Sequence, residues 1–393
     1  MKLNPDWLSS PQTKTLIKAF AGQSEKIRFV GGAIRDYLLE TSAQDVDVAT
    51  TLLPQDSLEL LQKSGIRAIP TGIKHGTITA VIDSKNFEIT TLRRDVACDG
   101  RHADVEFTDD WREDAARRDF TMNALYLSVD GELFDYFGGV DDTRAGRVCF
   151  IGDARDRIAE DYLRILRFFR FFAYYGKGEA DKTALAACTQ FASEIKSLSG
   201  ERIQHEMLKL LAAPAPFVAL ELMQNTGVLE QVCGFKCRPL SSDKFEVKQN
   251  HLRLALLILS AEIPPTQALE LLSARWKLSS DLKKSLLLYI SRIHDISPSL
   301  SIAQQKHLIR TLGAEDFSSL VLLKMALKPD KNYIDMQSLA ASWEIPVMPI
   351  NGSDLIEAGI KEGKELGEKL SKLEKLWEES DYKLTKEELK RRI

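Results

Sequence analysis

The sequence predicts an α+β fold in which a mixed α/β part comes first and an all-helical part follows. Residues 1–145 contain short runs of β-branched and aromatic residues separated by turn residues, which is typical of strands. From about Asp156 onward, the apolar residues recur at helical spacing instead. A length of 393 residues is enough for two or three domains with substantial cores.

The expected strands are short and follow one another closely. They are Ile27–Val30, Asp45–Ala49, Ile66–Ile69, Thr77–Ile82, Phe87–Leu92 and Ala124–Val129. The last strand is followed by Glu132–Phe134 across Asp130-Gly131, and an Asp-Gly pair in this position predicts a hairpin.

The expected helices belong almost entirely to the later part of the chain. They include Ile158–Tyr174, Glu201–Leu211, Phe217–Met223 and Leu252–Leu259. Proline-containing or polar joints at Pro214, Pro216, 239–250 and 346–349 separate helical units. We therefore predict four segments, 1–145, 146–213, 214–345 and 346–393, and the Lys- and Glu-rich residues from Lys369 onward predict a solvent-exposed helix.

Composition excludes several classes of protein. A net charge of -4 and a pI near 6.0 exclude a generally basic nucleic-acid binder, although a local basic patch can still bind a polyanion. The five cysteines lack the spacing of a zinc site, so we expect reduced thiols. Met1–Phe20 has no signal-peptide core and no apolar run reaches membrane-spanning length. We expect a cytoplasmic protein with no membrane partner, and the sequence leaves the oligomeric state open.

The first functional motif is a glycine turn followed by two carboxylates. Alternate residues of a strand share a face, so we expect Asp45 and Asp47 to point the same way. Paired carboxylates suit Mg²⁺, which prefers oxygen ligands and leaves coordination positions for substrate phosphates. Gly31 and Gly32 let backbone N–H groups approach an anion beside Arg35. The motif predicts a site for a metal-bound triphosphate; the alternative is a polar strand end with an ordinary turn.

A second motif precedes the expected strand Ala124–Val129. Arg117 and Arg118 can neutralise phosphate, while Asp119 and Asn123 can hydrogen-bond ribose hydroxyls. By itself, this segment would be only the charged end of a helix.

A third motif places Asp161, Arg164, Arg167 and Arg170 at three-residue steps, which we expect to lie on one face of a helix. An Asp accepts a hydrogen bond from an exocyclic amine and an Arg donates to ring acceptors, so Asp161 and Arg164 together complement cytosine and adenine. Guanine and uracil present a carbonyl group there, and an unmatched buried polar group costs about 1–3 kcal/mol. A salt-bridged amphipathic helix is the alternative.

Taken in order, these motifs resemble those of the class II tRNA nucleotidyltransferases, the CCA-adding enzymes of the polymerase-β-like superfamily. The resemblance covers most of the chain. Its five blocks are Gly31-Gly32-x-x-Arg35-Asp36 with Asp45-x-Asp47 (motif A), Arg117-Arg118-Asp119-Phe120 (B), Asp135-Tyr-Phe-Gly138-Gly139 (C), Glu160-Asp161-x-x-Arg164 (D) and Ser199-Gly200-Glu201-Arg202 (E). Tyr162 departs from the pattern, because family members often have proline after the Glu-Asp pair.

The resemblance implies a catalytic head at 1–145, a nucleotide-selecting neck at 146–213, a body at 214–345 and a tRNA-binding tail at 346–393. It implies the following site residues: Asp45 and Asp47 as catalytic ligands of two Mg²⁺ ions, Gly32 and Arg35 on the triphosphate, Arg118 and Asp119 on phosphate and ribose, Asp161 and Arg164 as the base-selecting pair, and Arg167 and Arg170 completing the nucleotide site. The implied substrates are CTP, ATP and the 3′ end of tRNA.

Three further features refine this prediction. Thr91–Ala103 resembles the flexible loop with which the family changes from C to A addition, and Glu88 is a candidate third carboxylate. The basic residues of Thr385–Arg392 are a candidate tRNA contact, with a solvated helix end as the alternative. A poly(A) polymerase, a CC- or A-adding specialist and a catalytically silent nucleotide- or RNA-binding module remain alternative functions.

Overall fold

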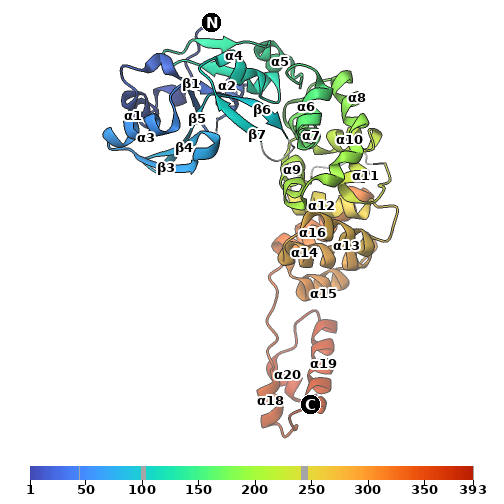
Figure 1. Cartoon of the computed structure of the whole chain (residues 1–393). Helices are drawn as coiled ribbons and strands as arrows, with labels where there is room; N and C mark the ends of the chain where they lie inside the picture. The colour runs from blue at the N-terminus through green and yellow to red at the C-terminus, as the bar shows by residue number, and fades with distance from the viewer. Residues whose placement is uncertain (44, 99–102, 240–246, 393) are drawn as a thin grey trace. The chain divides into compact units, whose positions relative to one another are not determined.

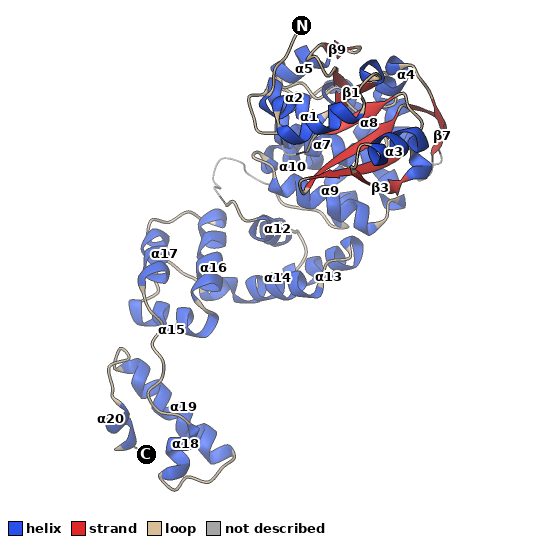
Figure 2. Cartoon of the chain, turned by 90° about the vertical axis from the view of Figure 1, so that its left-hand side faces the viewer, coloured by secondary structure: helices blue, strands red, loops and turns tan. Residues whose placement is uncertain are grey.

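The computed structural model describes residues 1–43, 45–98, 103–239 and 247–392. The chain forms two compact units, Met1–Leu240 with Ala274–Lys277, and Ser241–Ser273 with Leu278–Ile393. In the described residues, strands occur only in the first unit, whereas the second is built from helices (Figure 2). This arrangement confirms the predicted α+β class, and the four-segment division stays a prediction.

A seven-stranded mixed sheet with the order β3-β4-β5-β2-β1-β8-β9 forms the centre of the N-terminal part (Figure 1). All neighbouring strands are antiparallel except β2 and β5, which are parallel. The strands are β1 Ile27–Val30, β2 Asp47–Thr50, β3 Arg67–Gly72, β4 Thr77–Ile82, β5 Lys85–Thr91, β8 Leu125–Leu127 and β9 Leu133–Asp135. The predicted hairpin is confirmed, because β8 and β9 pair with Leu127 opposite Leu133.

Eleven α-helices of the described chain lie in the first unit. They are α1 Pro11–Ala19, α2 Gly32–Leu38, α3 Pro54–Lys63, α4 Trp111–Ala116, α5 Gly139–Ala145, α6 Ala154–Glu160, α7 Leu163–Tyr175, α8 Lys182–Gln190, α9 Gly200–Ala212, α10 Pro216–Asn225 and α11 Val228–Cys233. Short 3-10 helices occur at Asp6–Ser9, Ser24–Lys26, Ile73–His75, Thr121–Asn123, Ala192–Ser197 and Ile293–Asp295, the last in the second unit. Helix α7 packs against α9 and α10, so motifs D and E of the sequence are neighbours in space.

The second unit contains the remaining helices of the described chain. They are α12 Asn250–Leu259, α13 Pro265–Trp276, whose last residues belong to the first unit, α14 Ser280–Arg292, α15 Ile302–Leu312, α16 Ala314–Leu327, α17 Asn332–Ser342, α18 Gly352–Glu357, α19 Lys364–Glu379 and α20 Lys386–Lys390. As expected, α19 exposes most of its Lys and Glu residues, but one face of the helix is buried. Its Leu373 and Trp377 are buried with Ile350, Leu355 and Leu389, because one face of the helix is apolar.

The predicted loop Thr91–Ala103 differs from the structure, which has strands there. Strands β6 Arg93–Cys98 and β7 Ala103–Phe107 pair as an antiparallel ribbon, and residues 99–102 lie outside the described part. Backbone pairing forms this ribbon, and the exposed ion pair of Arg94 with Glu106, at 2.8 Å, joins the two strands at opposite positions.

The core of the sheet comes from alternating apolar residues. Ile27, Phe29 and Val48 are buried on one side against α1, α2 and α3, together with Leu16 and Ile34. Burial of these side chains fixes the register of β1 and β2, because a shift by one residue would turn them toward the opposite face.

Motif C fixes the entrance to α5 against the segment that carries motif B. The carboxylate of Asp135 accepts hydrogen bonds from the backbone N–H groups of Phe137, Gly139 and Val140. A Cβ atom at Gly139 would lie 2.2 Å from the carbonyl oxygen of Thr121, so only glycine allows this approach. Motif C is therefore a packing element in this chain.

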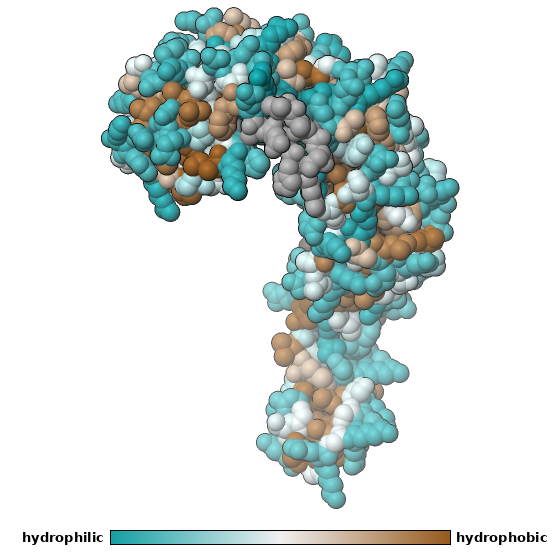
Figure 3. All heavy atoms as spheres, in the orientation of Figure 1, coloured by the Kyte–Doolittle hydropathy of each residue, from teal (hydrophilic) through white to brown (hydrophobic). Residues whose placement is uncertain are grey.

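No described helix is both long and apolar enough to cross a membrane. Hydrophilic residues dominate the visible surface of the head, where the hydrophobic areas are small and separate (Figure 3).

Candidate active site

The carboxylates of Asp45 and Asp47 lie where β2 begins, next to β5. Strand β2 starts at Asp47, so Asp45 precedes the strand rather than lying within it as predicted. Both residues nevertheless line one cavity. Glu88 is on β5, the parallel neighbour of β2.

Electrostatic coupling joins these three residues. The pKa of Asp47 is raised to about 6, because burial and the charges of Glu88 and Asp45 together outweigh the opposing charge of Arg118. Oxygen donors that repel one another suit a divalent cation, because the cation removes that repulsion. In the described residues, no three His, Cys, Asp or Glu side chains are already arranged around a common metal position. As oxygen donors, the carboxylates of Asp45 and Asp47 could hold Mg²⁺ with substrate oxygens completing its coordination.

A cavity of about 490 Å³ brings motifs A, B, D and E together. Asp47 of motif A and Asp161 of motif D both line this cavity. The complete lining is Gly31, Gly32, Asp47, Arg117, Arg118, Asp119, Asn123, Asp161, Leu163, Arg164, Arg167 and Arg202. Of the predicted site residues, the structure places Gly32, Asp47, Arg118, Asp119, Asp161, Arg164 and Arg167 in this one cavity.

A second cavity, of about 730 Å³, meets the first at Gly32 and Asp47. It contains the other predicted site residues, Arg35, Asp45 and Arg170. Gly31 precedes α2 with a φ of 76°, a conformation that favours glycine, and this turn lets the chain enter α2 between the two cavities.

The guanidinium of Arg118 is held by the buried carboxylate of Asp114. The Nη2 atom of Arg118 lies 3.1 Å from Oδ2 of Asp114, and the Tyr126 hydroxyl donates to the same oxygen at 2.7 Å. Burial would raise the pKa of Asp114, but Arg118, Arg117 and the Tyr126 hydroxyl outweigh it and hold that pKa at about 2. Asp114 therefore stays ionised and fixes two arginines beside the cavity.

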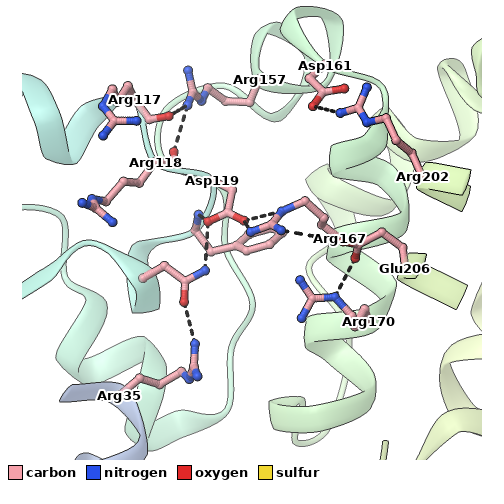
Figure 4. Close-up of polar contacts among 12 residues, drawn as sticks. Arg35, Arg117, Arg118, Asp119, Arg157, Asp161, Arg167, Arg170, Arg202 and Glu206 are labelled. Atoms are coloured by element: carbon pink, nitrogen blue, oxygen red, sulfur yellow. Dashed lines mark hydrogen bonds and ion pairs between the residues drawn. The ribbon is translucent and has the colours of Figure 1, made fainter. Parts of the chain in front are cut away.

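A chain of hydrogen bonds connects Arg35 of motif A with Arg167 of α7 (Figure 4). Arg35 donates to Oδ1 of Asn123 at 2.7 Å, and Nδ2 of Asn123 donates to Oδ1 of Asp119 at 2.9 Å. The Nε atom of Arg167 then donates to Oδ2 of Asp119 at 2.8 Å. Burial opposes ionisation of Asp119, but Arg167 and Asn123 lower its pKa. These hydrogen bonds thus link α2 with α7 through Asn123 and Asp119.

Glu206, on α9, closes this chain from the other side. Its Oε2 atom accepts a hydrogen bond from Nε of Arg170 at 2.6 Å, and its Oε1 atom lies 3.8 Å from Nη1 of Arg167. The carboxylate is buried, so these two arginines of α7 are held by a charge that solvent does not screen.

Asp161 does not lie within a helix, which corrects the one-face prediction for the third motif. Helix α6 ends at Glu160 and α7 begins at Leu163, while Asp161 has extended backbone angles. Its Oδ1 atom accepts a hydrogen bond from the N–H group of Leu163, the first residue of α7, at 3.1 Å. The three-residue spacing to Arg164 could not reveal this break between the two helices.

The base-selecting pair has protein partners of its own. Arg202 donates from Nη2 to Oδ2 of Asp161 at 2.7 Å. Arg164 donates to the carbonyl oxygen of Arg157 at 2.7 Å and to the carboxylate of Glu160. Arg157 also donates to the carbonyl oxygen of Arg118 at 2.9 Å, which ties α6 to motif B.

Sequence reasoning missed the supporting residues Arg157 and Glu206, and it gave Asp114 and Arg202 no role. The spacing of Arg202 and Glu206 by four residues, on an expected helix next to motif D, was a usable signal. It indicated one face but not which partners that face would meet.

A mixed sheet with paired carboxylates at a strand start, beside an arginine-rich cavity, defines this protein as a nucleotidyltransferase. Comparison with family models agrees: residues 27–149 match the poly A polymerase head domain, and residues 179–233 match the probable RNA and SrmB-binding site of polymerase A.

Individual relatives give a narrower assignment. The chain is 37% identical to the human mitochondrial CCA tRNA nucleotidyltransferase 1, over 96% of this chain and 88% of the relative. It is 29% identical to the CCA-adding enzyme of Staphylococcus epidermidis, covering 88% of this chain and 87% of that enzyme. The crystal structure of the Bacillus stearothermophilus CCA-adding enzyme in complex with CTP has a TM-score of 0.77 at 26% identity, covering 95% of this chain and 94% of that one. The chain belongs to the CCA tRNA nucleotidyltransferase family.

Proposed function

We propose that this enzyme adds C, C and then A to the 3′ end of tRNA, using CTP and ATP without a nucleic-acid template. The observation that carries the proposal is that Asp47 and Asp161 line one cavity. A nucleotide whose base meets Asp161 would lie in the same cavity as the carboxylate beside which nucleotidyl transfer takes place. Relatives named CCA-adding enzymes support the same substrates.

In the proposed reaction, the 3′-hydroxyl of the acceptor attacks the α-phosphate of the nucleotide and pyrophosphate leaves. Asp45 and Asp47 would hold Mg²⁺, with Glu88 as a third carboxylate, and the bound cations would polarise the hydroxyl and neutralise the leaving oxygens. Arg118 and Arg35 neutralise phosphate charge, with Gly32 beside them where the two cavities meet.

The remaining residues select and orient the nucleoside. Asp161 accepts from the exocyclic amino group of cytosine or adenine, and Arg164 donates to the ring acceptors. Asp119 contacts the ribose, and Arg167 and Arg170 complete the nucleotide site. The Lys and Arg residues of Thr385–Arg392 bind tRNA phosphates, and the protein acts in the cytoplasm.

One assay tests the proposal. The enzyme is given tRNA that ends before CCA, tRNA that ends in CC, or an unrelated RNA, each with labelled CTP or ATP, and the products are resolved at single-nucleotide resolution. Addition of CCA to the first tRNA and of A to the second is expected. A long A tract would identify a poly(A) polymerase, addition of C or A alone would identify a specialist, and no product would favour a silent binding module.

A further inference from the structure

The ion pair between Asp161 and Arg202 lies inside the nucleotide cavity but belongs to neither the metal site nor the phosphate site. Asp161 stands between α6 and α7, and Arg202 stands in the first turns of α9 (Figure 4). Their side chains are 27% and 31% exposed, and both line the cavity. An ion pair exposed to this extent adds little stability, so its main consequence is geometric.

Two donors fix the carboxylate of Asp161 from two directions. The N–H group of Leu163 binds Oδ1 at 3.1 Å, and Nη2 of Arg202 binds Oδ2 at 2.7 Å. An ionised carboxylate offers about four acceptor positions, so these two bonds leave acceptor capacity for a base. Without Arg202, rotation about the carboxyl bond would turn those lone pairs away from a bound base.

The start of α9 is held in place, so Arg202 presents its guanidinium from a fixed backbone. A Cβ atom at Gly200 would lie 2.3 Å from the carbonyl oxygen of Arg275, which shows how closely the two backbones approach. Arg275 in turn donates to the carbonyl oxygen of Leu198 at 3.2 Å and to that of Ile195 at 2.6 Å. One turn further along α9, Glu206 binds Arg170 of α7.

We infer that Arg202 is a positioning residue for base selection: it sets the orientation in which Asp161 accepts the amino group of cytosine or adenine. This inference rests on the proposed role of Asp161 as base reader. Binding of cytosine or adenine depends on the position of the Asp161 lone pairs, whereas binding of uracil does not. Loss of Arg202 therefore weakens the binding of CTP and ATP more than that of UTP.

The test measures equilibrium binding of CTP and UTP by calorimetry, in the presence of Mg²⁺ and without acceptor RNA. Arg202→Met removes the donor and keeps the length of the side chain. Lys209→Met is the matched control, because Lys209 is an exposed cation on the same helix and outside the cavity lining. We expect Arg202→Met to lower the ratio of CTP affinity to UTP affinity about tenfold, because the misplaced Asp161 carboxylate loses its hydrogen bond to the amino group of the base. Lys209→Met is expected to leave this ratio unchanged.

A double-mutant cycle separates positioning from a merely structural effect. In the Asp161→Ala background, Arg202→Met is expected to have no further effect on the ratio, since the group it orients is gone. Equal loss of CTP and UTP affinity in Arg202→Met, or an undiminished effect on the ratio in the Asp161→Ala background, would overturn the inference.

Failure of the wider proposal gives a different result. If the wild-type enzyme binds CTP and UTP alike, the base-reading role of Asp161 fails and the inference falls with it. If the wild type prefers CTP and Arg202→Met keeps that preference, only the inference about Arg202 is wrong.

Discussion

The Glu206 carboxylate accepts a hydrogen bond from Nε of Arg170 at 2.6 Å, and this contact joins α9 to α7 behind the nucleotide cavity. Glu206 is 4% exposed. This buried charge orients Arg170, and it lies 3.8 Å from Arg167, which also binds Asp119.

Replacing Glu206 by Ala is expected to destabilise the first unit by about 3 kcal/mol, because it leaves a partly buried arginine without its partner. The free energy of unfolding of the first unit, obtained from urea denaturation, measures this effect. Glu201→Ala, at an exposed position of the same helix, is the control. A change equal to that of the control would contradict the role given to Glu206.

The carboxylate pair is expected to be needed for catalysis but not for folding. Asp45→Ala and Asp47→Ala should each abolish nucleotide incorporation, since a bound cation supplies several kcal/mol of charge stabilisation and each 1.4 kcal/mol is about a tenfold change in rate. Circular dichroism should show an unchanged fold. Incorporation at the wild-type rate in both variants would remove the metal assignment.

Mg²⁺ is expected to raise the thermal midpoint of the wild-type protein more than that of Asp47→Asn. The charge on Asp47 is unfavourable because of burial and of Glu88 and Asp45 nearby, and a divalent cation offsets that repulsion. Asp47→Asn without Mg²⁺ should be at least as stable as the wild type. Identical Mg²⁺ shifts in the two proteins would argue against a metal at Asp47.

Substitution of Asp161 is expected to change the selection among the four nucleotides more than it changes the affinity for the triphosphate group. Asp161→Ala removes the acceptor for the exocyclic amine, so incorporation of C and A should approach that of U and G. Competition experiments with all four nucleoside triphosphates measure the ratio. An equal loss with every nucleotide would count against selection by Asp161.

Asp114 is expected to make stability depend on pH under acidic conditions. Its pKa is about 2 in the folded state, against an ordinary value of 3.8, so the unfolded state binds more protons as pH falls. The difference corresponds to about 2 kcal/mol, present above pH 4 and lost as the pH approaches 2. In calorimetry, Asp114→Asn should be less stable than the wild type at pH 6, and this difference in stability should become smaller toward pH 3. A difference that does not change with pH would exclude this explanation.

The basic residues of Thr385–Arg392 are expected to have two different roles: some stabilise the fold and others bind RNA. Lys386 lies 2.6 Å and Lys390 3.8 Å from Oδ1 of Asp354, whereas Arg391 and Arg392 are exposed. Arg391→Gln combined with Arg392→Gln should weaken tRNA binding and flatten its dependence on salt, with no loss of fold. Filter binding at several salt concentrations measures this. An unchanged salt dependence would favour a solvated helix end.

Local patterns were sufficient for most secondary structure. The strands Ile27–Val30 and Thr77–Ile82 were predicted with their observed bounds, because alternating apolar residues between turns specify short half-buried strands. The break at Asp161 was missed because residue spacing does not show where one helix ends and the next begins, and its partner Arg202 lies 41 residues further along the chain. The ribbon β6–β7 was missed because strand pairing can order polar residues that a pattern of hydrophobicity reads as a loop.

The sequence by itself determined the types of chemical group in this protein: the two aspartates, the glycine turn, the arginine clusters and the family to which their order points. Only the tertiary structure decided which of these groups meet. It placed Asp47 and Asp161 in one cavity and gave Asp161, Asp119 and Arg170 their partners. The physical reason is that residue type and spacing specify local conformation, whereas ion pairs and cavities arise from packing between segments that are far apart in the chain.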